Sequence, residues 1–218
     1  MFEDNVDNFY GAAHSLYMDK YTMPKDGGYL LLDAIQEPVE ASFQAEPGTG
    51  KPYMSYMSKY RNTVRLIILI HDQNVGDVNW ENGAKEIKYF VDDGDFEIMK
   101  AGLKTNARVL FAAGAKQLYI PTSHKLTIDS EDQIDAVIDG LDNEPARYRY
   151  TSFHPQGTCR MGADPKTTVV SATGETHEVK NLYIVDASIL PTSIGYNPSE
   201  TVYALAHYIS DQVNQAHT

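Results

Sequence analysis

The sequence has little cysteine, little positive charge and no long apolar run. Cys159 is the only cysteine in 218 residues, which excludes an internal disulfide framework and a cysteine-rich site, and we predict no metal. Lys and Arg number 18 against 30 Asp and Glu, so the net charge is -12. Nucleic acids and anionic membranes reward clustered positive charge, and we therefore expect neither as a partner. The run RLIILI at 65–70 is far shorter than the roughly 20 residues of a membrane span.

The first ten residues, MFEDNVDNFY, lack the basic start and the apolar stretch of a secretory signal. Since no membrane span is predicted either, we expect a soluble protein of the cytoplasm or the periplasm. The sequence does not choose between these two compartments.

Hydrophobic residues make up 42% of the chain and aromatic residues 11%, which is enough to build a substantial core. Two segments read as buried strands, YLLLDAI at 29–35 and TVRLIILIHD at 63–72, and the second is expected to be buried on both faces. The pair Asn82-Gly83 predicts a turn into KEIKYFV, whose alternation is typical of a half-buried strand. KQLYIP at 116–121 suggests a further strand.

Two segments show helical periodicity. Residues 93–115 predict a helix that ends at Gly114. Residues 130–141 predict a second helix, opened by a capping box between Ser130 and Gln133. Strands and helices in this order favour an α+β fold, in which an antiparallel sheet carries helices on one face.

The character of the sequence changes at a polar joint, NEPARYRY, that ends at residue 150. We place a functional boundary there, with one region at 1–150 and a second at 151–218. The second region contains turns, one short strand and a terminal helix. The turn cluster EPGTGKP at 46–52 is not a phosphate-binding loop, because its last position is Pro52 instead of Ser or Thr.

The segment SFHPQGTCRMG at 152–162 holds a candidate general base. His154 precedes Pro155, which keeps its backbone out of the helical region, and Gly157 permits a sharp turn. A neutral imidazole held in this way could accept a proton near neutral pH. The alternative is a loop histidine that only bonds the backbone.

The segment NLYIVDAS places an acid after a short apolar run. Residues 182–185 predict a strand that ends at Asp186. In open α/β sheets, ligands bind beyond the carboxyl ends of strands, so Asp186 could accept hydrogen bonds from a ribityl or ribose hydroxyl. Capping of the following turn by Asp186 explains the same pattern equally well.

The last helix begins at an Asn-Pro pair. Pro198 suits the first helical position and Asn197 the N-cap. Unpaired backbone amides at Ser199 and beyond, together with the helix dipole, would form an anion site. Ordinary capping without a ligand is the alternative; if Ser199 were the cap, the Asn197 side chain would be available for a substrate. Apolar residues recur along one face of this helix: Val202, Leu205, Ala206, Ile209 and Val213.

At these residues the chain resembles the C-terminal part of the glucose–methanol–choline (GMC) oxidoreductases. HPQGTCRMG is similar to the family's H-P-x-G-T-x-R-M-G segment, and NLYIVDASILPTSIGYNPSETVYALA is similar to its N-L-x-V-x-D-A-S…N-P-x-x-T…A-L-A segment. The resemblance covers residues 152–213 well. It is looser over the stretch from GDVNW to KQLYIP, and weak over residues 1–60.

The resemblance implies a function and two catalytic residues. The family oxidises alcohol or sugar CH–OH groups, passing a hydride to N5 of FAD. It assigns the base that takes the alcohol proton to His154 and the hydrogen bond to the substrate oxygen to Asn197.

The resemblance also implies FAD contacts and names for the two regions. Asp186 and Ala187 would contact FAD, and Pro198 and Ser199 would meet the O2 edge of the flavin. Residues 1–150 then become a substrate-binding domain. Residues 151–218 become the catalytic loop and a strand–helix segment that completes the FAD-binding α/β domain.

The chain departs from the family in one respect, because it lacks the Gly-rich G-x-G-x-x-G fingerprint that opens the FAD-binding half. We therefore expect a fragment, a processed piece or one of two subunits, with an N-terminal FAD-binding half as partner and an alcohol or sugar as substrate. Alone, such a chain would bind FAD weakly or not at all. Two other functions stay open: a non-catalytic binding or structural module, and a flavin-containing lyase.

Overall fold

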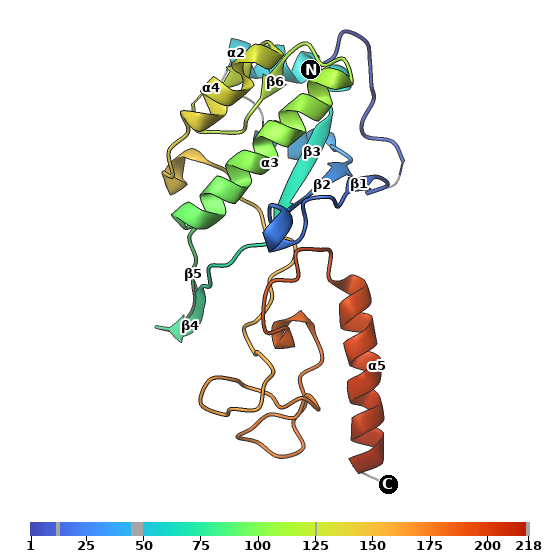
Figure 1. The fold of residues 1–218 in the computed structure, drawn as a ribbon, viewed down its shortest axis with the longest axis vertical. Coiled ribbons are helices and arrows are strands. Elements are labelled where there is room, and N and C mark those ends of the chain that lie inside the picture. Colours follow the sequence, from blue (N-terminus) through green and yellow to red (C-terminus); the bar gives the residue numbers. More distant parts are fainter. Residues whose placement is uncertain (12–13, 45–49, 125, 217–218) are drawn as a thin grey trace. The chain divides into compact units, whose positions relative to one another are not determined.

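A three-stranded antiparallel sheet forms the centre of the first of two structural units (Figure 1). The structure is a computed structural model, and it describes residues 1–11, 14–44, 50–124 and 126–216. The first unit comprises Met1–His71 and Val91–Tyr150, and the second comprises Asp72–Phe90 and Thr151–Thr218. The fold is α+β, as the sequence predicts. The functional boundary near 150 remains a prediction, since these units are defined by contacts and residues 72–90 group with the second.

The sheet has the order β1-β2-β3, with β1 at Tyr17–Met18, β2 at Tyr29–Ala34 and β3 at Arg65–Ile70. Strand β2 runs antiparallel to β3, from the pair Tyr29↔Ile70 to the pair Ala34↔Arg65. The central strand β2 is buried as predicted. The expectation that β3 is buried on both faces is wrong, because β3 lies at the edge of this sheet and all its residues are half-buried.

The long helix α3, Asp93–Ala112, packs on β2 and β3 as the main helix of the unit. It begins where the Asp92 side chain accepts a hydrogen bond from the Asp95 amide at 2.8 Å. It ends before Gly114, whose φ of 97° lies in the region that glycine adopts readily. At Gly102 the helix approaches the sheet closely, since a Cβ there would lie 2.6 Å from Cγ2 of Ile68.

The second predicted helix is shorter than expected. Residues Glu131–Gln133 form a 3-10 turn and α4 spans Ile134–Asp139. The predicted capping box is wrong: the Ser130 side chain caps nothing, and the Gln133 side chain accepts from the Asp129 amide instead. Ile134 and Ile138 are fully buried in the core of the unit.

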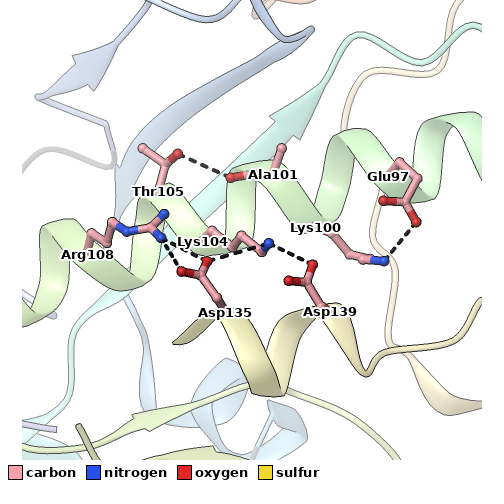
Figure 2. A network of polar contacts seen from close by, with 8 residues as sticks. All are labelled: Glu97, Lys100, Ala101, Lys104, Thr105, Arg108, Asp135 and Asp139. Carbon is pink, nitrogen blue, oxygen red and sulfur yellow. Dashed lines mark hydrogen bonds and ion pairs between the residues drawn. The ribbon is translucent and has the colours of Figure 1, made fainter. Parts of the chain in front are cut away.

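Ion pairs join α4 to α3 at the surface (Figure 2). The Lys104 ammonium lies 2.7 Å from the Asp139 carboxylate, and the Arg108 guanidinium lies 2.8 Å from Asp135. Exposed pairs of this kind contribute little individually, so the buried isoleucines of α4 carry most of the packing energy.

The remaining elements of the first unit are short. They are α1 (Pro38–Gln44), α2 (Lys51–Ser58), β6 (Leu118–Tyr119), β7 (Thr127–Ile128) and 3-10 turns at Pro24–Asp26, Tyr60–Asn62 and Pro145–Arg147. The strand expected at 116–121 is therefore reduced to the two residues of β6, which pair with β7. Residues 46–49 of the predicted turn cluster lie outside the described residues.

The second unit includes a hairpin of β4, Asp77–Glu81, and β5, Ala84–Lys88. Asn82 and Gly83 have φ values of 53° and 78°, as the tight two-residue turn requires. The expectation of a half-buried strand after this turn is wrong. Ile87 is 61% exposed and Trp80 on the paired strand is 73% exposed, because in the described chain neither face of the two-stranded ribbon is covered.

The rest of the second unit contains a 3-10 turn, Ala187–Ile189, and the terminal helix α5, Ser199–Ala216. The strand predicted at 182–185 does not form. Tyr183 makes one isolated bridge to Glu175 and Leu182 is 48% exposed, so within the described chain the segment lacks the neighbouring strands that a buried strand needs. No helix in the described part of the chain is both long and apolar enough for a membrane span.

Candidate functional site

The loop that carries His154 is joined to the Ala187–Ile189 turn by backbone hydrogen bonds. Three amides donate to three carbonyls: Gly157 to Ala187 at 3.5 Å, Cys159 to Ser188 at 2.9 Å and Met161 to Ile189 at 2.9 Å. We call these three bonds the backbone clamp. Gly157 has a φ of 81°, and a Cβ there would lie 3.3 Å from the Leu190 carbonyl oxygen. The clamp therefore holds the histidine loop against the turn that follows Asp186.

Helix α5 packs against the same turn through the core of the second unit. Val170, Ile189 and Ile209 are fully buried and form this core. Ile189 belongs to the turn and Ile209 to α5, so hydrophobic contact joins the two. All six residues predicted for the site lie in this unit, on the histidine loop, the turn and the start of α5. His154 itself is half-buried.

Asp186 caps the turn that it precedes. Its Oδ1 accepts a hydrogen bond from the Ser188 amide at 2.8 Å, which is one of the two roles expected from the sequence. The residue is exposed, and its other carboxylate oxygen accepts no hydrogen bond from the described residues. One oxygen thus positions the turn, and no donor among the described residues bonds the second.

The start of α5 lies one residue later than expected. The Val202 amide donates to the Pro198 carbonyl at 2.8 Å, so Pro198 occupies the N-cap position and Asn197 precedes it. Pro198 is buried, whereas Asn197 is exposed. The Asn197 side chain makes no hydrogen bond with the described residues, so it does not cap the helix.

The first turn of α5 has backbone donors without acceptors. Among the described residues nothing accepts from the amides of Ser199, Glu200 and Thr201, as is usual at a helix N-terminus without a side-chain cap. These amides and the helix dipole favour a negatively charged or carbonyl oxygen at this end. The arrangement fits the electron-rich edge of a flavin, and the exposed Asp186 carboxylate fits a hydroxyl donor.

Sequence reasoning did not single out Gln156, which lies between Pro155 and Gly157 in the histidine loop. Its Oε1 atom is buried and has no hydrogen-bond partner among the described residues. A buried acceptor without a donor is costly. Its position two residues after His154 was the only signal in the sequence that could have drawn attention to it.

Comparison with known proteins places the chain in a family. Residues 75–206 match the GMC oxidoreductases, and the chain therefore belongs to this family of oxidoreductases. The resemblance inferred from the two motifs around His154 and Asn197 is confirmed.

Individual relatives agree with this assignment. A long-chain-alcohol oxidase of Arabidopsis thaliana, FAO3, is 32% identical over 181 residues, which make up 78% of this chain and 24% of that protein. An uncharacterized GMC-type oxidoreductase of Mycobacterium tuberculosis is 26% identical over 212 residues, or 97% of this chain and 33% of that protein. The chain thus spans about a quarter to a third of the length of these relatives.

Two solved structures share the fold. Pyridoxine 4-oxidase from Mesorbium loti superposes with a TM-score of 0.55 at 23% identity, covering 86% of this chain and 34% of its own. A formate oxidase of Aspergillus oryzae superposes with a TM-score of 0.56 at 19% identity, covering 91% and 33%. At these identities the likeness concerns the fold alone.

Proposed function

We propose that this chain forms the substrate-binding and catalytic part of an FAD-dependent oxidoreductase that oxidises an alcohol or sugar CH–OH group. The proposal rests mainly on the backbone clamp, which fixes the loop of a candidate base beside the turn of a candidate FAD ligand. Membership of the GMC family and the alcohol oxidases among the relatives support it. An N-terminal FAD-binding half, in the same polypeptide or on a partner, supplies the rest of the cofactor site.

Within this proposal, His154 accepts the proton of the substrate hydroxyl as the CH–OH carbon is oxidised. The exposed amide of Asn197 orients the substrate oxygen through a hydrogen bond. When FAD is bound, it supplies the acceptor for the hydride that leaves the substrate carbon. The protein contributes the position of the base and the orientation of the alcohol, which together raise the rate of the step.

Four residues would contact FAD. The Asp186 carboxylate oxygen that does not bond Ser188 accepts from a hydroxyl of the cofactor, and the backbone of Ala187 follows it on the turn. Pro198 and Ser199 present the open end of α5 to the flavin O2 edge. In functional terms the chain divides near residue 150, with substrate binding at 1–150 and catalysis at 151–218.

The test uses an enzyme assembled from this chain and an FAD-binding half, supplied on the same polypeptide or by co-expression. Flavin reduction by a long-chain primary alcohol such as dodecan-1-ol is followed without oxygen. We expect His154→Ala to lower the reduction rate by about 10² to 10⁴. His207→Ala is the matched control, because His207 is 81% exposed on α5 and should leave the rate unchanged.

Equal rates for the His154→Ala enzyme and the unchanged enzyme would refute the assignment of the base. An assembled protein that is folded but takes up no flavin would instead favour a non-catalytic binding module. A flavin that stays oxidised with alcohols, while the enzyme cleaves a C–C bond of a hydroxylated substrate, would favour the lyase.

A further inference from the structure

The hairpin of β4 and β5 has one apolar face and one charged face. Direct partners across an antiparallel ribbon share a face, and so do residues two positions apart on one strand. The register pairs Val78 with Ile87 and Trp80 with Lys85. Val78, Trp80 and Ile87 therefore lie on the same side, which we call the apolar face. Besides Ala84, the opposite side holds polar and charged side chains: Asp77, Asn79, Glu81, Glu86 and Lys88.

The apolar face is uncovered in the part of the chain that the structure describes. Trp80 is 73% exposed, Ile87 61% and Val78 48%. The three side chains together expose roughly 300 Å², and contiguous apolar patches of this size on a monomer are often functional. Trp80 is also the only tryptophan of the chain, and tryptophan is enriched among the residues that carry most of the energy of an interface. The face therefore has the size and composition of a docking surface.

The hairpin itself would be stabilised by a partner on this face. A two-stranded hairpin alone is at best marginally stable in water, and packing one face against another surface stabilises it. The ladder of β4 and β5 runs from the pair Asp77↔Lys88 to the pair Glu81↔Ala84, and no third strand among the described residues extends it. Docking would bury the apolar face and protect this short ladder at the same time.

Three observations favour the FAD-binding half as the partner. By its contacts the hairpin belongs to the second unit, which holds all six proposed site residues and which the FAD-binding half meets in the proposed function. The hairpin also lies within residues 75–206, the part that matches the GMC oxidoreductases. The chain corresponds to only 24% of FAO3 and 33% of the Mycobacterium tuberculosis relative, so proteins of this kind contain a large further surface that can cover the face.

A second copy of this chain fits the face less well. Two apolar faces packed against each other would bury about 600 Å², which is about half of the roughly 1,200 Å² at which stable interfaces begin. Each copy also carries a net charge of -12, so two copies repel each other. A larger partner meets neither difficulty, because the apolar face is then one part of a wider interface.

We propose that the apolar face of the β4–β5 hairpin is a docking surface for the FAD-binding half, with the Trp80 side chain as its main anchor. The inference rests on the proposed function, because it names the contact surface of the partner proposed there. It adds a role for three residues that lie outside the histidine loop, the Ala187–Ile189 turn and α5.

The first measurement compares Trp80 in this chain alone with Trp80 in the assembled enzyme. Hydroxyl-radical footprinting read by mass spectrometry reports the oxidation rate, and the peptide is assigned unambiguously because the chain has one tryptophan. We expect oxidation to be at least about tenfold slower in the assembled enzyme, since an anchor residue lies in the fully buried core of an interface.

Three variants with the same new residue test which face docks. The readout is hydrogen exchange of peptides from 77–88 in the assembled enzyme. Trp80→Thr should speed exchange about 30- to 1,000-fold, as the loss of an anchor residue implies, and Ile87→Thr about tenfold. Asn79→Thr is the matched control on the charged face, and it should leave exchange unchanged because threonine suits a strand.

Circular dichroism of this chain alone establishes that each variant is folded. Should Trp80→Thr unfold the chain, Ile87→Thr decides, because it keeps a β-branched residue in the strand. Sedimentation of the chain alone reports whether two copies associate.

Three results would overturn the proposal. The first is equally fast oxidation of Trp80 in the chain alone and in the assembled enzyme. The second is slow oxidation already in the chain alone, which would place a second copy on the face if the chain sediments as a dimer, and another part of the same chain if it is a monomer. The third is hydrogen exchange that Trp80→Thr and Ile87→Thr leave unchanged, or that Asn79→Thr speeds as much.

The docking surface and the proposed function fail separately in these measurements. Slow oxidation of Trp80 in an assembled enzyme whose flavin no alcohol reduces would support the docking surface and count against the alcohol oxidation. Fast oxidation of Trp80 in an enzyme whose flavin is reduced by alcohol would do the opposite.

Discussion

Replacing Gly174 with alanine should loosen α5 from the rest of the second unit. Gly174 has a φ of 79°, and a Cβ there would lie 2.8 Å from Cδ1 and 2.9 Å from Cγ2 of Ile209. Ile209 is fully buried in the core that joins α5 to the Ala187–Ile189 turn. The substitution therefore strains the backbone and overfills the core at the same point.

The two costs can be estimated separately. A non-glycine residue in the left-handed region costs about 1–2 kcal/mol, and overpacking of a core typically costs about 1–3 kcal/mol. We expect the two to lower the free energy of unfolding of the second unit by about 2–5 kcal/mol. Gly83→Ala is the matched control, because Gly83 has a φ of 78° with nothing within 4 Å of its Cβ position, so it should carry the backbone cost alone.

Hydrogen exchange measured on peptides from 199–216 follows this change directly. A loss of about 2–5 kcal/mol corresponds to exchange faster by about 30- to 4,000-fold, at roughly 1.4 kcal/mol per factor of ten. Adding Ile209→Val to Gly174→Ala should recover part of the protection, because it removes Cδ1 while the contact at Cγ2 stays. Equal exchange of α5 in the Gly174→Ala and Gly83→Ala proteins would refute the packing argument.

Three further outcomes are expected. A hydrogen bond from Arg108 lowers the pKa of Asp135. The stabilisation of α4 by this pair is therefore complete above about pH 4 and is lost as the pH falls through the lowered pKa. Hydrogen exchange of α4 should lose this acid dependence in Asp135→Asn. Burial, and to a lesser extent the charge of Tyr148, raise the pKa of Tyr150 to about 12. Stability should therefore fall between about pH 10 and pH 12, and an ultraviolet titration of Tyr150→Phe should show one late-ionising tyrosine fewer than that of the unchanged chain. Asn197→Ala should slow alcohol turnover in the assembled enzyme without lowering its melting temperature, because the Asn197 side chain bonds no described residue; a large drop in melting temperature would contradict this.

Elements with a strong periodic pattern could be predicted from the sequence. The helix at 93–112 and the strand at 29–34 follow from their own residues, because one has an apolar stripe with a cap and the other an apolar run. Burial could not be predicted as well. The pattern of KEIKYFV is that of a half-buried strand, yet Ile87 is mostly exposed, since burial depends on what covers a strand and not on its alternation.

The candidate site was only partly predictable. The histidine motif and the Asn-Pro pair were visible because their side chains and turn residues are distinctive. The strand expected before Asp186 did not form, since a strand needs partners that no local pattern supplies. The backbone clamp could not be seen at all, because amides and carbonyls are common to almost every residue.

The backbone clamp has a consequence for mutational tolerance, because it joins peptide groups and not side chains. Exchanging side chains at positions 159 and 161 leaves the bonded N–H groups in place, so the distance from the imidazole-bearing segment to Ala187 survives most substitutions there. Proline alone removes the donor outright. A library that randomises Cys159 should therefore retain folded members with many different residues and be depleted mainly of proline. At Met161 the folded members should also stay apolar, because this side chain packs against the core of Val170, Ile189 and Ile209.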